Sequence, residues 1–231
     1  MRFLTVVLSL ICLVVMAGER PADWTDPHLD NLDPEKWQPL DPYRFPHIRV
    51  QAGPYADDLA AMAEAFDEIG ETILDEVHAA ATAAELPVFV TGVSLKGELV
   101  RRTHFFPVLQ ETVPGIAPTE EHLRIFFNPR MGLKVPGGVQ SPLMGLFHEL
   151  HHALIFLEDP EANAKYYPAL YGETDRHTLS ASPLERHIEK EEMLIIRGEE
   201  WRLARKLKQP ARRTHTGQPV RVTGPLSTQP W

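Results

Sequence analysis

Cysteine is almost absent from this chain of 231 residues, which contains only Cys12. Cys12 lies in an apolar N-terminal segment that we expect to be removed on export, so the mature chain would have no cysteine. Without thiols it can form neither a disulfide framework nor a thiolate metal site. Any metal site must therefore be built from His, Asp or Glu.

The N-terminal segment carries the features of a secretory signal. Residues 1–17 combine one basic residue, Arg2, with an apolar run that ends in small residues, and the run is short for a membrane span. We predict a signal peptide cleaved before Gly18, and hence a secreted or periplasmic protein that does not contact the membrane after cleavage. An uncleaved membrane anchor is the alternative.

Basic residues are outnumbered, with 23 Lys and Arg against 32 Asp and Glu. The formal net charge of −9 becomes −10 once Arg2 leaves with the signal peptide. An acidic surface repels phosphate backbones, which argues against nucleic acid as a partner. The composition is otherwise that of one globular domain, with no internal repeat, and no feature predicts an oligomeric state.

Both ends of the mature chain lack periodicity. Residues 18–54 are rich in Pro and Asp with scattered aromatic residues, which predicts an extended arm lying on the domain. A removable pro-segment that covers the active site is the alternative. Residues 216–231 predict a flexible C-terminal tail, so the folded domain would span residues 55–215.

Apolar spacing within the domain indicates an α+β fold. Residues 55–86 show a helical period with a possible kink at Gly70, and residues 87–99 and 122–127 are typical of strands. Residues 130–140 are predicted to be a loop. We therefore expect a small mixed sheet packed on helices, with a zinc motif on a central helix.

That motif is His148-Glu149-Leu150-His151-His152, which contains the pattern His-Glu-x-x-His. On a helix His148 and His152 lie on one face, one turn apart, so both imidazoles can bind one metal ion. Glu149 can then act as a base on water bound at an open position of the metal. This chemistry is typical of zinc metallopeptidases, whose substrate is a polypeptide.

The surrounding sequence places the motif on a buried helix. Ser141 is suited to an N-cap and Pro142 to the first helical position. Apolar residues then recur at spacings of three or four, at Leu143, Phe147, Leu150 and Leu154. We predict a helix from Ser141 to Glu158, with the motif near its middle. The alternative is a buried helix whose histidines only pack and form hydrogen bonds.

A third protein ligand has several candidates. Asp159 follows His152 by seven residues, but a continuous helix would carry it about ten ångströms along the axis. A second helix, residues 184–207, has the acidic pair Glu191 and Glu192 beside an apolar face, where a carboxylate is costly unless paired or metal-bound. The helical wheel slightly favours Glu191. His151, His177, His187 and His215 are the remaining candidates.

Several stretches resemble the effector-type zincin metallopeptidases of bacterial secreted effectors and toxins. The resemblance rests on the apolar run into residues 148–154, Glu191-Glu192-Met193 ahead of Gly198, Glu200 followed by Arg202, Leu207, Pro210 and Arg212, and an upstream helix and two strands ending in Asn128-Pro129. It implies a zincin-like fold, His148 and His152 as zinc ligands, Glu149 as general base and Glu192 as the third ligand. Glu191 is kept as the alternative.

The resemblance is weaker at the end of this region. The family tends to have Arg followed by Tyr where this chain has Arg212-Arg213-Thr214-His215. His215 is therefore the predicted group that steadies the oxyanion, since a His or a Tyr can do so. Tyr166, Tyr167 and Tyr171 are rival candidates.

Together these features predict a secreted zinc metallopeptidase, and the resemblance implies an effector or toxin. The alternative from another class is an exported zinc-binding or structural protein without catalytic activity.

Overall fold

The computed structural model describes residues 37–51, 53, 55–91, 94–95, 98–99, 104–108, 121–160, 163, 183–214 and 217–231. All of these residues belong to one compact unit that runs from Asp33 to Trp231. The predicted signal peptide, the three tyrosines and His215 lie outside the described residues.

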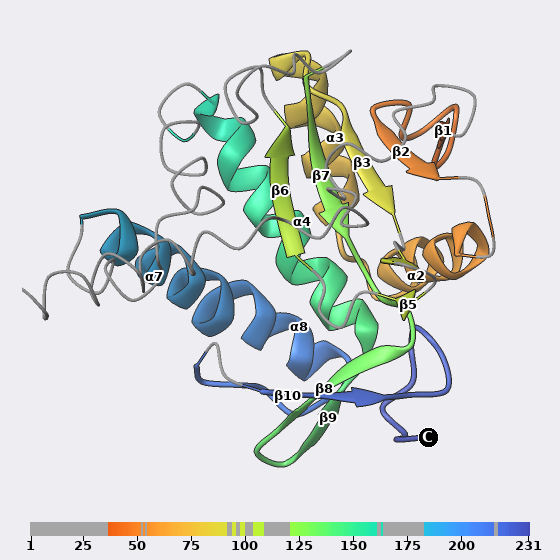
Figure 1. Ribbon diagram of the computed structural model, residues 1–231, viewed down its shortest axis with the longest axis vertical. Helices are drawn as coiled ribbons and strands as arrows, with labels where there is room; N and C mark the ends of the chain where they lie inside the picture. The colour runs from red at the N-terminus through yellow and green to blue at the C-terminus, as the bar shows by residue number, and fades with distance from the viewer. Residues whose placement is uncertain are drawn as a thin grey trace, which may run out of the picture. The chain divides into compact units, whose positions relative to one another are not determined.

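Helices and strands both contribute to this unit (Figure 1). The helices are α2 (Ala56–Glu68), α3 (Ile73–Ala84), α4 (Pro142–Glu158), α7 (Pro183–Ile195), the π-helix η2 (Ile196–Glu200) and α8 (Trp201–Lys206). The strands are β1 (Trp37–Pro39), β2 (Ile48–Gln51), β3 (Val88–Thr91), β4 (Ser94–Leu95), β5 (Glu98–Leu99), β6 (His104–Val108), β7 (His122–Phe126), β8 (Met131–Val135), β9 (Gly138–Gln140) and β10 (Gln218–Arg221). The predicted α+β class is confirmed.

The largest sheet has the order β1-β2-β3-β7-β6 and is mixed. Strands β2, β3 and β7 run parallel, while β1 and β6 are antiparallel strands at its two edges. Helices α2 and α3 connect β2 to β3, as a parallel pair requires a long crossover. A second sheet has the order β10-β8-β9, and β4 and β5 form a separate hairpin.

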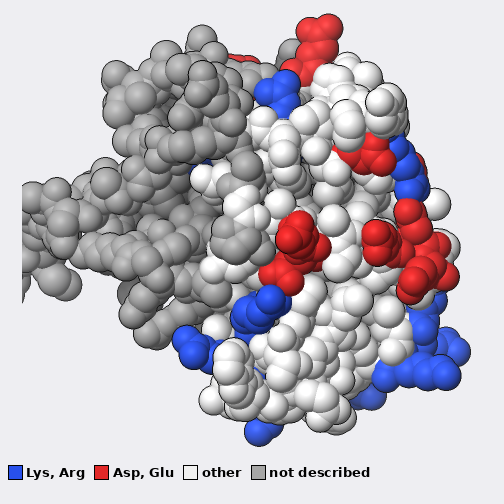
Figure 2. Space-filling model, turned by 90° about the vertical axis from the view of Figure 1, so that its right-hand side faces the viewer, with Lys and Arg blue, Asp and Glu red and all other residues white. Residues whose placement is uncertain are grey.

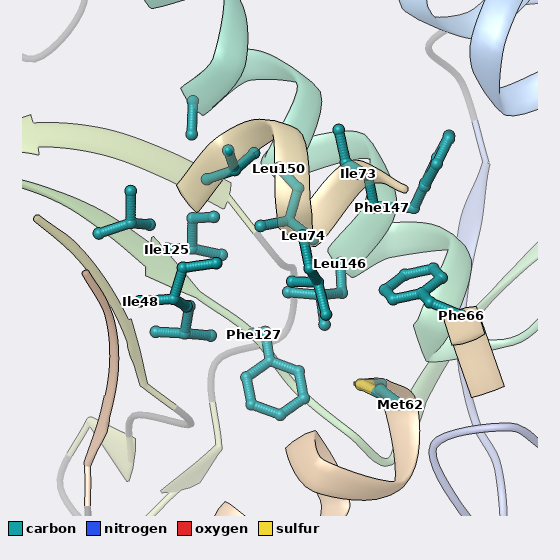
Figure 3. Close-up of a cluster of buried hydrophobic side chains, with 14 of the residues drawn as sticks. Ile48, Met62, Phe66, Ile73, Leu74, Ile125, Phe127, Leu146, Phe147 and Leu150 are labelled. Atoms are coloured by element: carbon teal, nitrogen blue, oxygen red, sulfur yellow. The ribbon is translucent and has the colours of Figure 1, made fainter. Parts of the chain in front are cut away.

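The core lies between one face of the largest sheet and helices α3 and α4 (Figure 3). Alternate strand residues point to this face, as the two-residue period of a strand dictates. The side chains labelled in Figure 3 are Ile48, Met62, Phe66, Ile73, Leu74, Ile125, Phe127, Leu146, Phe147 and Leu150. Because α4 contributes fully buried residues to this core, the packing fixes the rotation of the helix that carries the motif.

The predicted helix over residues 55–86 is in fact two helices. Gly70 adopts a left-handed conformation with φ of 64°. The Glu71 N–H donates to Phe66 O and the Gly70 N–H to Asp67 O, which is the Schellman pattern that ends α2. Glycine therefore terminates the helix here, where a kink was expected.

The predicted extended arm needs correction over its last residues. Strand β2 lies between β1 and β3, with Ile48 and Val50 in the core. Apolar residues alternate with Arg49 and Gln51, which is a strand period hidden in the sequence by nearby prolines. The folded domain thus begins before Tyr55.

Two further expectations are corrected around β8. Residues 130–140 were predicted to be a loop, but they form the β8–β9 hairpin, whose turn includes Gly137 with φ of 97°. The predicted flexible tail contains β10, which pairs with β8. Val222 is fully buried, so the C-terminal residues are part of the folded unit.

An ion-pair network ties α8 to the start of α3. Both Glu71 carboxylate oxygens accept hydrogen bonds from Arg202, at 2.8 and 3.0 Å, and Lys206 lies 3.4 Å away. Burial alone would raise the pKa of Glu71, but these cations outweigh it and hold the pKa below its usual range. The network helps to hold the α7–α8 segment beside the core.

On the face shown in Figure 2, basic side chains gather mainly toward the lower end and acidic side chains lie mainly above them, with groups of both signs adjacent in places. Among the described residues, none of the helices has both the length and the apolar character needed to cross a membrane.

Candidate metal centre

Helix α4 begins and ends where the sequence predicts. Ser141 has an extended conformation directly before Pro142, and its backbone N–H donates to the Gln209 side-chain oxygen at 2.8 Å. Asp159 ends the helix. Because Phe147 and Leu150 are fully buried, the helix presents His148 and His152 toward α7.

His148, His152 and Glu192 converge on one point. The two imidazole Nε2 atoms are 3.1 Å apart, and the Glu192 oxygens lie 3.1 Å from Nε2 of His148 and 3.4 Å from Nε2 of His152. These three side chains can hold a metal ion. A tetrahedral zinc with ligands at about 2.0–2.2 Å separates its ligand atoms by about 3.3–3.6 Å. The observed separations of 3.1 to 3.4 Å lie within about 0.2 Å of this range.

The electrostatics of the group favour a cation. Burial by itself would lower the pKa of His152, but hydrogen bonds with Glu191 and Glu192 raise it to about 10. Burial would raise the pKa of Glu192, but its hydrogen bonds with the two histidines hold it far below the usual range. In the metal-free protein, protons on the histidine thus supply the positive charge that stabilises the buried carboxylates.

Glu191 lies behind His152 and outside the ligand group. Its Oε1 is 2.6 Å from His152 Nδ1. An ionised carboxylate can only accept, so it holds a proton on Nδ1, and a metal that displaces the second proton of the ring would bind at Nε2. Of the acidic pair, Glu191 is the more buried carboxylate, and Glu192 is the one that faces both Nε2 atoms and belongs to the group that could hold a metal ion.

Sequence reasoning gave no role to the residues behind His148. Glu200 Oε2 is 3.2 Å from His148 Nδ1, and Arg212 Nη2 is 3.0 Å from the same atom. Arg212 also pairs with Glu200 at 2.7 Å, and the Gln140 amide donates to Glu200 at 3.0 Å. Glu200 lies in the π-helix η2, which shifts the helical phase, so a wheel of 3.6 residues per turn cannot place it.

Glu149 adjoins the ligand group and is largely buried. Burial raises the pKa of its carboxyl, and the nearby His148 and His152 partly offset this rise, with a smaller contribution from a hydrogen bond from the Phe105 backbone. The Phe105 ring stacks on the His152 ring, with 6.4 Å between the ring centroids. A carboxylate with a raised pKa beside a metal site is suited to accept a proton near neutral pH.

The other predicted candidates do not join the group among the described residues. Asp159 is exposed at the end of α4. His151 packs edge-on against Phe147 at 4.5 Å, and burial lowers its pKa to about 4, so the ring is neutral. The side chains of His177, His187 and His215 lie outside the description.

The strand upstream of the motif is not the edge of the sheet. Strand β7 is paired on both sides, with β3 and β6. Among the described residues, β6 pairs only with β7, and it supplies the Phe105 backbone contact to Glu149. Among the described strands, the edge beside the candidate metal centre is therefore β6.

Comparison of the chain with models of known protein families, with curated proteins and with solved structures found no match in any of the three. The resemblance to effector-type metallopeptidases is therefore untested by relatives. The chemistry of the site rests on its own geometry.

Proposed function

We propose that this protein is a zinc-dependent metallopeptidase with a zincin-like fold. The observation that carries the proposal is the convergence of His148 Nε2, His152 Nε2 and Glu192 within zinc-binding distances, next to the buried Glu149. Two histidines and one carboxylate leave a fourth position open, as a hydrolytic zinc site requires.

Each residue has a distinct part in the proposed reaction. His148, His152 and Glu192 would hold the zinc, which when bound acidifies water and polarises a carbonyl group. Glu149 would take a proton from the attacking water and pass it to the leaving amine. We assign the support of the oxyanion to His215, with Tyr166, Tyr167 and Tyr171 as the rival candidates.

The proposed substrate is a polypeptide that lies along β6. An extended peptide can add to a sheet edge through main-chain hydrogen bonds, and β6 is the edge that contacts the motif helix. A chain in that position would pass Phe105 and reach Glu149.

Export is part of the proposal and rests on residues 1–17 alone. If the signal peptide is cleaved as proposed, the exported protein begins at Gly18. Intact-mass measurement of the exported protein checks this, and a membrane-bound form that retains Met1 would show an anchor instead.

Metal content tests the site. The purified protein should contain about one zinc per chain and cut members of a broad peptide library, with cleavage lost on chelation and restored by zinc. His152→Ala should abolish zinc binding, because it removes one of the ligands.

The matched control is the variant His151→Ala at the adjacent residue, whose ring packs on Phe147 and is not part of the ligand group. It should retain most of the zinc. Equal loss from the two variants would show that the ligands are assigned wrongly. One zinc per chain with an uncut library would leave a zinc-binding protein without catalysis.

A further inference from the structure

Behind His148 lies a buried cluster of charged and polar groups that the proposed reaction does not use. Glu200, Arg212 and Gln140 are 1%, 8% and 2% exposed, and all three come from elements outside α4. Arg212 contacts both Glu200 oxygens, at 2.7 and 2.8 Å, and Gln140 donates to Oε1 at 3.0 Å. Glu200 is thus held rigidly at Nδ1 of His148.

Nδ1 of His148 lies near two groups that favour opposite protonation states of this nitrogen. The Glu200 carboxylate, at 3.2 Å, can only accept a proton from Nδ1. The Arg212 guanidinium, at 3.0 Å, can only donate one to it. The position of the imidazole proton therefore depends on which neighbour prevails.

Only one of these arrangements allows a metal to bind. If Nδ1–H donates to Glu200, the Nε2 lone pair is free for a metal ion. If Arg212 donates to Nδ1, the neutral ring carries its proton on Nε2 and cannot coordinate there. A carboxylate behind a ligating histidine also increases its basicity.

We infer that Glu200 is a positioning residue that holds His148 in its metal-binding tautomer, and that Arg212, while orienting Glu200, competes with it for Nδ1. The inference rests on the proposed function, since it concerns zinc at Nε2. It gives this ligand a different support from His152, whose Nδ1 is 2.6 Å from Glu191.

Zinc affinity of Glu200→Gln tests the inference. The variant keeps the size of the side chain but replaces the charged acceptor with a neutral amide that has one acceptor oxygen and one donor nitrogen, which lets Arg212 compete more effectively for Nδ1. Competition with a chromophoric chelator should show about 10- to 100-fold weaker zinc binding, the usual effect of losing such a partner. The control Glu199→Gln lies on the same π-helix, faces Arg202 instead and should bind zinc as the wild type does.

The double variant Glu200→Gln/Arg212→Met separates positioning from a merely structural role. Removing the competing donor should restore zinc affinity to within about tenfold of the wild type. Nitrogen-15 NMR of the zinc-loaded wild type should show the His148 proton on Nδ1, and circular dichroism of each zinc-free variant checks its fold.

Equal zinc affinity in Glu200→Gln and the wild type would overturn the inference, and so would a double variant that binds no more tightly than the single one. A wild-type protein that binds no zinc would instead overturn the proposed function.

Discussion

Glu149→Gln should lower the rate of peptide cleavage by about 10²- to 10⁴-fold while zinc content and melting temperature barely change. The substitution keeps the size and shape of the side chain and removes its ability to accept a proton. Glu149 lies outside the ligand group of His148, His152 and Glu192, so its substitution should not weaken zinc binding. The measurements are cleavage of a peptide that the wild type cuts, zinc content, and thermal unfolding.

The matched control is Glu158→Gln, the same change on an exposed residue of the same helix. It should leave the cleavage rate unchanged. If Glu149→Gln still cleaved at nearly the wild-type rate with contaminating protease excluded, the general base would have to be another group, and Glu191 or His151 would be tested next.

The motif helix could be predicted because its signals are local. Ser141, Pro142 and Asp159 mark its ends, and apolar spacing fixes its buried face. The position of His148 and His152 on one face of this helix then follows from helical geometry alone. A feature that depends on a single element can thus be predicted from the sequence.

The contributions of other elements could not be predicted in the same way. Strand β10 forms because β8 offers it a partner, and nothing in residues 216–231 shows this pairing. The edge position of β6 likewise depends on the order of the strands in space. Such features arise from tertiary context that overrides weak local preference.

The acidic pair combines a feature that the sequence predicts with one that it does not. Glu191 and Glu192 were singled out because carboxylates are costly at an apolar face unless something pairs with them. That reasoning holds for both residues, since one contacts Nδ1 of His152 and the other faces the two Nε2 atoms. The assignment within the pair needed the direction of each side chain, which one sequence does not contain.

Arg212→Met should destabilise the zinc-free protein by about 3–5 kcal/mol, the usual cost of removing one partner of a buried ion pair. Arg212 is the cation that contacts both oxygens of Glu200, which is itself 1% exposed. Burial would raise the pKa of Glu200, but hydrogen bonds with His148 and Arg212 lower it to about 2, so the carboxylate is charged at neutral pH. Without Arg212 this charge loses the counterion that contacts both of its oxygens, in a region shielded from water.

Urea unfolding of the wild type, of Arg212→Met, of a control and of a double variant measures the effect. Arg205→Met is the control, since Arg205 is exposed and lies over the Trp201 ring, and its loss should cost about 0.5 kcal/mol or less. Adding Glu200→Gln to Arg212→Met removes the charge that was left uncompensated. The double variant should therefore be more stable than Arg212→Met alone, because replacing both partners avoids the cost of one buried charge. If Arg212→Met were as stable as Arg205→Met, the contacts among Arg212, Glu200 and His148 could not be a buried ion-pair cluster in solution.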